Sequence, residues 1–285
     1  MTQEELNRQM IKAADNRDTK TVREMLEQGA DPNSRDNSGY TALMYACRDR
    51  RTDTARLLLE HEADPNVQDN YGETALMYAC RWGYTDIAIL LLEAEADPNV
   101  QDNYGKTTFM YACRNGEPEM IQMLLDAKVD PNVQSRDGYT ALMEACRYGR
   151  TDTAGLLLEH EADPNVQDNY GETALMKACR GGETEMIKML VNAGADVNAR
   201  DSMGESALIW AAQFGYTDIM EILLKAGADP SIKDNAGRTV FETLKECHPE
   251  KYSEWIQNTV VKSRQKTLQR EDSRRSRRCV PDFDI

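Results

Sequence analysis

The sequence lacks long apolar stretches and contains few residues of the types that most often carry catalysis or span membranes. Among 285 residues there are only 3 His, 3 Trp and 4 Phe. No apolar run approaches the roughly 18 residues that a membrane helix needs. The first residues show neither the basic start nor the apolar stretch of a secretory signal peptide. We therefore expect no membrane span and a cytoplasmic location, with nuclear entry or export without a signal peptide left open.

The three histidines offer no catalytic arrangement. His61, His160 and His248 have no serine or cysteine partner in a recognisable nucleophile motif. The chain contains no Cys-x-x-Cys pair that would suggest a metal or redox site. The sequence therefore predicts a protein that is not an enzyme and that uses no cofactor, metal or small-molecule substrate.

Five cysteines recur at one position of a repeating pattern. They are Cys47, Cys80, Cys113, Cys146 and Cys179. If they lie on stacked helices roughly 10 Å apart, their separation exceeds the Cα distance that a disulfide allows. We interpret them as small buried residues in a reducing compartment.

Charge is unevenly distributed along the chain. The net charge is -15, yet residues 258–285 carry more lysine and arginine than aspartate and glutamate. An acidic body repels nucleic acid and keeps a chain in solution. The basic tail is either a solvated end or a contact for nucleic acid or another anionic surface.

The dominant feature is a period of 33 residues without one insertion. Seven glycines mark it: Gly39, Gly72, Gly105, Gly138, Gly171, Gly204 and Gly237. A fixed period of this length is typical of a solenoid, in which each repeat buries its apolar face only against its neighbours.

Each repeat predicts a hairpin of two helices. In the repeat around Gly72, Thr74 is a good N-cap, and Leu76 and Cys80 belong to an apolar stripe at helical spacing. Gly83 should end this first helix, and we expect Thr85 to cap the second. The following segment is rich in Asp, Asn, Pro and Gly, and should project as a turn.

These motifs resemble ankyrin repeats. The resemblance rests on Gly-x-Thr-x-Leu, the small pair Ala211-Ala212, Leu-Leu and Gly-Ala-Asp-Pro at a period of 33 residues. It implies an all-α solenoid, a right-handed stack of helix-turn-helix units with β-hairpin fingers and a capping repeat at each end. It also implies that partners bind along a concave groove formed by the fingers and the first helices.

On this pattern we expect four segments. They are an amino-terminal capping repeat at 1–35, six repeats at 36–233, a carboxy-terminal capping repeat at 234–257 and a basic, partly helical tail at 258–285.

The chain departs from the family pattern in two ways. It has Thr-Ala-Leu-Met where the family usually has Thr-Pro-Leu-His, so methionine packing must replace the usual histidine hydrogen bonds. Four residues also stand where the family usually has glycine after the second helix: Glu62, Glu95, Lys128 and Glu161. We expect left-handed backbone there, which disfavours residues with a Cβ.

A row of arginines and aromatic residues is the predicted partner-binding surface. Its members are Arg48, Tyr71, Tyr78, Arg81, Trp82, Tyr104, Tyr111, Arg114, Arg147, Tyr148, Tyr170, Arg180, Trp210 and Phe214. Arginine with tyrosine and tryptophan is the composition of interface hot spots. The prediction is a protein-binding scaffold, monomeric when unbound, whose groove holds an acidic or phosphorylated partner segment.

An intramolecular role for the arginines stays open. Glu144 stands three residues before Arg147 and could pair with it as a surface ion pair of little value. Residues 51–81 and 150–180 are near copies, so repetition alone can multiply an arginine. Variation at one equivalent position favours partner contact instead: Tyr45, Glu144, Lys177 and Trp210.

Overall fold

The computed structural model describes residues 1–257 and divides into two parts. The amino-terminal part is Met1–Asp196, and the carboxy-terminal part begins at Val197. Each part is described by itself. The predicted basic tail lies outside the described residues.

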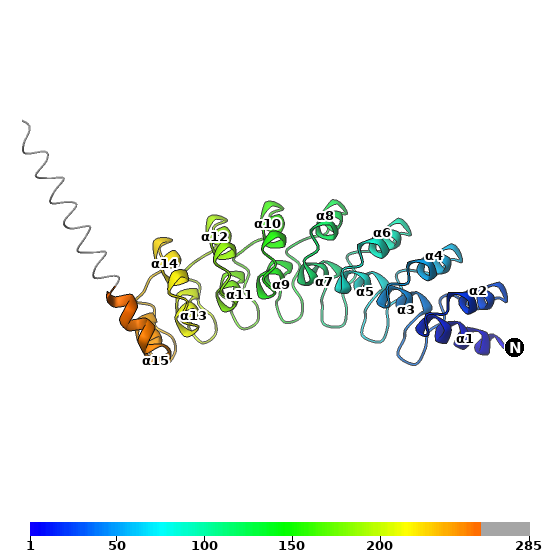
Figure 1. Ribbon diagram of the computed structural model, residues 1–285, viewed down its shortest axis with the longest axis horizontal. Helices are drawn as coiled ribbons and strands as arrows, with labels where there is room; N and C mark the ends of the chain where they lie inside the picture. Colours follow the sequence, from blue (N-terminus) through cyan, green and yellow to red (C-terminus); the bar gives the residue numbers. More distant parts are fainter. Residues whose placement is uncertain (258–285) are drawn as a thin grey trace, which may run out of the picture. The chain divides into compact units, whose positions relative to one another are not determined.

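The amino-terminal part consists of six helical hairpins. The first helices are α1 (Gln3–Asp15), α3 (Ala42–Arg48), α5 (Ala75–Trp82), α7 (Thr108–Asn115), α9 (Ala141–Arg147) and α11 (Ala174–Gly181). The second helices are α2 (Thr19–Glu27), α4 (Thr52–Glu60), α6 (Thr85–Glu93), α8 (Pro118–Asp126), α10 (Thr151–Glu159) and α12 (Thr184–Asn192). First helices pack on first helices and second helices on second helices, and the connecting loops project from the row of first helices (Figure 1).

The first helices begin at a threonine, as the sequence predicts. The hydroxyl of Thr74 accepts a hydrogen bond from the backbone N–H of Met77 at 3.4 Å. Gly83 ends this helix in the left-handed region, which confirms the second prediction for this repeat. The expected cap of the second helix is wrong: Tyr84 takes the N-cap position, no side chain caps α6, and Thr85 is its first residue.

The core lies between neighbouring repeats. Five methionines at one repeat position, four in Thr-x-Leu-Met motifs and Met110 in Thr-x-Phe-Met, are at most 1% exposed: Met44, Met77, Met110, Met143 and Met176. The five repeat cysteines are also fully buried, and burial raises the pKa of a thiol such as that of Cys80. Methionine packing therefore fills the interface between repeats, and the cysteines remain inert thiols.

The loops are tight turns more than β-hairpins. Within residues 1–257 there is one isolated β-bridge, between Gln101 and Thr107, and no strand. A side chain holds each turn instead, and it is an aspartate in every described turn except that of Ser135. One carboxylate oxygen of Asp69 accepts hydrogen bonds from the N–H groups of Tyr71 at 2.8 Å and Glu73 at 2.9 Å.

Asparagine side chains in the loops that follow the second helices also connect successive repeats. Asn66 accepts a hydrogen bond from the N–H of Asp97 at 2.7 Å and donates to the carbonyl of Glu95 at 3.2 Å. Asn33, Asn132 and Asn165 make the same two contacts with the next repeat.

The predicted left-handed positions are confirmed. The backbone φ angles are 64° at Glu62, 63° at Glu95, 59° at Lys128 and 63° at Glu161. Two further non-glycine residues share this conformation, Arg17 at 64° and Arg50 at 54°. Arg50 stands where the next repeat has Gly83, so the chain carries backbone strain at two places in a repeat.

The carboxy-terminal part contains α13 (Ala207–Gln213), α14 (Thr217–Lys225) and α15 (Val240–Cys247), followed by helical residues 249–257. Helix α13 packs against both α14 and α15. The ring of His248 is 3.0 Å from the carbonyl oxygen of Gln213. Over the whole described chain, no helix combines the length and apolar character needed to span a membrane.

Candidate partner-binding surface

The arginine row lies on the first helices of the amino-terminal part. Arg48 and Arg81 are half-buried, whereas Arg114, Arg147 and Arg180 are exposed. The five arginines have different surroundings. They fall into two classes, those with a carboxylate partner within residues 1–257 and those without one.

The arginines at the two ends of the row, Arg48 and Arg180, lie close to carboxylates. Arg48 contacts Asp15 at 3.0 Å and Asp49 at 3.0 Å. Arg180 lies 3.9 Å from a carboxylate oxygen of Glu172.

Arg81 has the densest surroundings of the row. It donates to the carboxylate of Glu73, and its guanidinium carbon lies 4.3 Å from the centre of the Tyr111 ring. Displacing this arginine toward a partner would leave Glu73, a buried residue, without its cation.

The central arginines have no carboxylate partner among residues 1–257. The guanidinium carbons of Arg114 and Arg147 lie 4.7 Å and 5.8 Å from the centre of the same Tyr148 ring. Arg147 also donates a long hydrogen bond of 3.4 Å to the Tyr139 hydroxyl. We call Arg114, Tyr148 and Arg147 the central cluster.

The sequence shows why the centre differs. Glu73 and Glu172 follow the repeat glycine in their repeats, but the corresponding residues in the two central repeats are Lys106 and Tyr139. Lys106 is used within the fold, since its ammonium lies 2.7 Å from the buried carboxylate of Glu144. The predicted alternative pair between Glu144 and Arg147 is therefore wrong.

Three aromatic residues assigned to the partner surface are buried. Tyr78, Tyr111 and Trp210 are 3%, 6% and 5% exposed. The two tyrosine hydroxyls donate to Asp69 at 2.7 Å and Asp102 at 2.6 Å. Burial raises the pKa of both tyrosines, and the carboxylates that they face raise it further.

Trp210 makes the equivalent contact in the carboxy-terminal part, where its indole N–H donates to Asp201 at 2.9 Å. Trp210 was predicted to lie on the contact surface, but its side chain is buried and is paired with the loop aspartate. Tyr78, Tyr111 and Trp210 therefore support the fold, and we no longer assign them to the contact surface.

The varied position has the same structural role in every repeat. Lys177 replaces tyrosine and donates to Asp168 at 2.7 Å and to Glu172. Where Ser135 replaces the loop aspartate, Glu144 stands at this position and takes Lys106 as its partner. The variation that suggested partner contact thus reflects alternative buried pairs.

The remaining aromatic residues of the prediction are exposed. The exposed fractions are 55% for Tyr71, 58% for Tyr104 and 62% for Tyr170 at the loop tips. At the ends of first helices they are 55% for Trp82, 37% for Tyr148 and 38% for Phe214. Side chains of this size usually cover apolar area in a contact with another protein.

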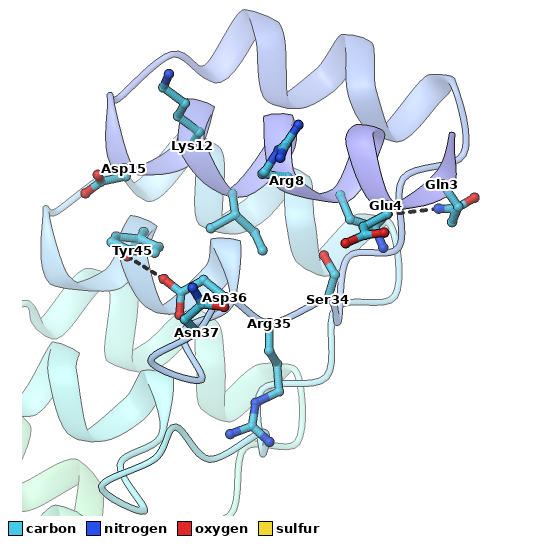
Figure 2. A pocket seen from close by; sticks show the side chains of 12 residues that line it. Gln3, Glu4, Arg8, Lys12, Asp15, Ser34, Arg35, Asp36, Asn37 and Tyr45 are labelled. Carbon is cyan, nitrogen blue, oxygen red and sulfur yellow. Dashed lines mark hydrogen bonds between the residues drawn. The ribbon is translucent and has the colours of Figure 1, made fainter. Parts of the chain in front are cut away.

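A pocket that the sequence did not reveal lies at the amino-terminal end of the row. It is formed by α1 and the loop before α3, and its volume is about 650 Å³ (Figure 2). Asp15 lines this pocket and pairs with Arg48, the first arginine of the row. We call it the amino-terminal pocket.

No group of three or more metal-ligating side chains occurs within residues 1–257.

Family models for ankyrin repeats match residues 10–102, 94–168 and 160–234. The chain belongs to the ankyrin-repeat family.

A solved structure of the ankyrin repeat domain of Bcl-3, described as a member of the IkappaB protein family, is similar to it with a TM-score of 0.64 and 26% identity. The similarity covers 78% of this chain and 100% of that one. No match is found among the curated proteins. An ankyrin array is a protein-interaction scaffold, and this chain has that architecture.

Proposed function

We propose that this ankyrin array binds an acidic or phosphorylated segment of a partner protein along its concave groove, with an anionic group at the central cluster. The observation that carries the proposal is the pair of exposed arginines, Arg114 and Arg147, which flank Tyr148 without a carboxylate partner in the described chain. One copy of the chain suffices, and no cofactor is involved.

The chemistry of the cluster suits an anionic side chain. A guanidinium presents planar, paired donors that match carboxylate or phosphate oxygens. The exposed Tyr148 ring between the two arginines adds apolar area and restricts where the guanidinium groups lie. Binding there displaces no internal ion pair, whereas binding at Arg48 or Arg81 would do so.

The charge of the whole chain sharpens this choice. With a net charge of -15, most of the protein repels an acidic segment. A basic cluster on such a surface gives orientation, because like charges oppose other placements of the segment. The exposed loop-tip residues Tyr71, Tyr104 and Tyr170 would then cover the apolar side chains of the same segment.

Reversing the charge of the cluster tests the proposal. The variant Arg114→Glu/Arg147→Glu should lose the partners that affinity capture with mass spectrometry recovers on the wild type. It should also bind a short fluorescent peptide with a central phosphoserine between glutamates roughly a hundredfold or more weakly, because each hot-spot contact contributes about 2 kcal/mol.

The matched control is Arg56→Glu/Lys188→Glu, which makes the same charge change on the second helices α4 and α12. Circular dichroism should show that both variants are folded. Equal retention of partners and peptide by the wild type and the central double variant would refute the assignment of the groove.

A further inference from the structure

The amino-terminal pocket has the features of a second anion-binding site in the same groove. We infer that it binds an acidic side chain of the partner segment, at a fixed distance from the group held at the central cluster. This inference rests on the proposed function and specifies the partner further.

Two cations of the pocket are not used by the fold. Arg8 and Lys12 are exposed, lie one turn apart on α1 and form no ion pair within residues 1–257. Two lining carboxylates, Glu4 and Asp36, and a third cation, Arg35, likewise form no ion pair within this range. The three unpaired cations outnumber the two unpaired carboxylates, so the unpaired charge of the pocket is positive.

The other charged residues of the pocket are committed. Asp36 accepts hydrogen bonds from the Tyr45 hydroxyl at 2.8 Å and from two backbone N–H groups of its own turn. Asp15 is held by Arg48. Arg35 donates to the carbonyl of Gly39 at 3.1 Å. These groups shape the pocket and leave Arg8 and Lys12 to meet a ligand.

A hydrogen-bond donor and an apolar wall complete the site. The hydroxyl oxygen of Ser34 is shielded from solvent and has no hydrogen-bond partner within the described chain, although Ser34 lines the pocket. Ile11, which lies between the two cations in the sequence of α1, also lines the pocket and provides apolar contact. A volume of about 650 Å³ falls in the range of pockets that enclose drug-sized ligands, so an acidic residue with its neighbours fits.

The spacing of the helices fixes the separation of the two sites. The pocket lies at α1 and α3, and the central cluster lies at α7 and α9. Three steps of 8 to 10 Å between packed helices give roughly 24 to 30 Å. An extended chain advances about 3.3 Å per residue, so the two acidic positions should be about eight residues apart.

Peptides with one or two acidic clusters test this spacing on the full chain. One fluorescent peptide carries a single phosphoserine-glutamate cluster, and two others carry a second cluster after about three or about eight Gly-Ser residues. Anisotropy should show that the longer spacing binds at least about tenfold more tightly than the single cluster, since the second contact becomes intramolecular. The shorter spacing should give less than half of that gain.

Variants separate the two sites. Arg8→Glu/Lys12→Glu should remove the gain and leave the affinity for the single cluster within about twofold, and Arg8→Gln/Lys12→Gln should reduce the gain without reversing charge. Lys20→Glu/Arg23→Glu makes the same charge change on α2, outside the pocket, and should keep the gain.

A gain that survives Arg8→Glu/Lys12→Glu, or is absent although the single cluster binds, overturns the pocket and leaves the proposed function standing. Single-cluster binding that is absent, or insensitive to Arg114→Glu/Arg147→Glu, overturns both.

Discussion

Two lines of side chains run along the first helices three residues apart, and they behave in opposite ways. The inner line changes residue type from repeat to repeat but always forms a polar pair that is buried or partly buried: Tyr45, Tyr78, Tyr111, Glu144 and Lys177. The outer line keeps one residue type while its surroundings change: Arg48, Arg81, Arg114, Arg147 and Arg180.

The comparison teaches that, in a repeat protein, residues of the same type can have different roles and residues of different types can have the same role. Fold constraints act on pairs, so Lys177 can replace a tyrosine wherever a carboxylate receives it. Whether an arginine of the outer line is available to a partner protein depends on a neighbouring residue in another part of the repeat. Arg114 has no carboxylate partner within residues 1–257 because Lys106, and not a glutamate, follows its repeat glycine.

Removing the buried ammonium of the inner line should have the largest effect. Lys177→Met leaves Asp168, which is fully buried, without its cation and should destabilise the fold by about 3 to 5 kcal/mol. Lys177→Tyr should recover most of that loss, because tyrosine hydroxyls donate to the equivalent aspartate in three other repeats. Urea denaturation measures both, and equal midpoints for the two variants would contradict a shared role.

Breaking the ion pair between Lys106 and Glu144 should destabilise the fold less, because Lys106 is partly exposed. Lys106→Met leaves Glu144 buried without its cation and should destabilise by about 2 kcal/mol. Lys106→Met/Glu144→Met should be more stable than the single variant. A double-mutant cycle gives the coupling energy between Lys106 and Glu144, and a value near zero would show that the two side chains do not stabilise each other.

Backbone strain offers a smaller gain in each repeat. Glu62→Gly, Glu95→Gly, Lys128→Gly and Glu161→Gly should each stabilise by up to about 1 kcal/mol, since all four residues are left-handed. Gly194→Glu is the reverse control, because a Cβ at Gly194 meets nothing within 4 Å and only the φ of 85° opposes it. Lower denaturation midpoints in the four glycine variants would refute the argument.

The smallest effect is expected in the carboxy-terminal part, where Gln213 replaces the arginine of the outer line. Burial and the nearby Asp201 raise the pKa of Glu205, so the folded state binds more protons than the unfolded state. Stability from this group therefore falls as pH rises from the ordinary glutamate pKa through the raised value. Glu205→Gln should remove that fall in denaturation midpoints measured across mildly acid pH, and an unchanged pH profile would contradict the assignment.

Local sequence rules predicted the repeat architecture well. The period, the threonine caps of the first helices and the left-handed residues such as Glu62 follow from short-range chemistry. Burial of Tyr78 and Tyr111 was missed because the residues that cover them lie in a loop nine positions earlier, which helical periodicity does not register.

The central cluster and the pocket needed still longer-range information. The absence of a carboxylate partner for Arg114 within the described residues depends on Lys106 and on its pair with Glu144, which are 38 residues apart in the chain. The pocket combines α1 with a loop that follows α2, and its net character emerges only after Asp15 and Asp36 find their partners.

A scan of the outer line tests the central claim most directly. Each arginine is changed singly to glutamate, and anisotropy measures affinity for the single-cluster phosphoserine peptide while urea denaturation measures stability. Arg114→Glu and Arg147→Glu should each weaken binding by roughly thirtyfold with little change in stability, and Arg48→Glu and Arg180→Glu should change it by less than about threefold. Arg81→Glu should instead lower stability, because it faces Glu73. An equal loss of affinity in all five variants would contradict the division of the row.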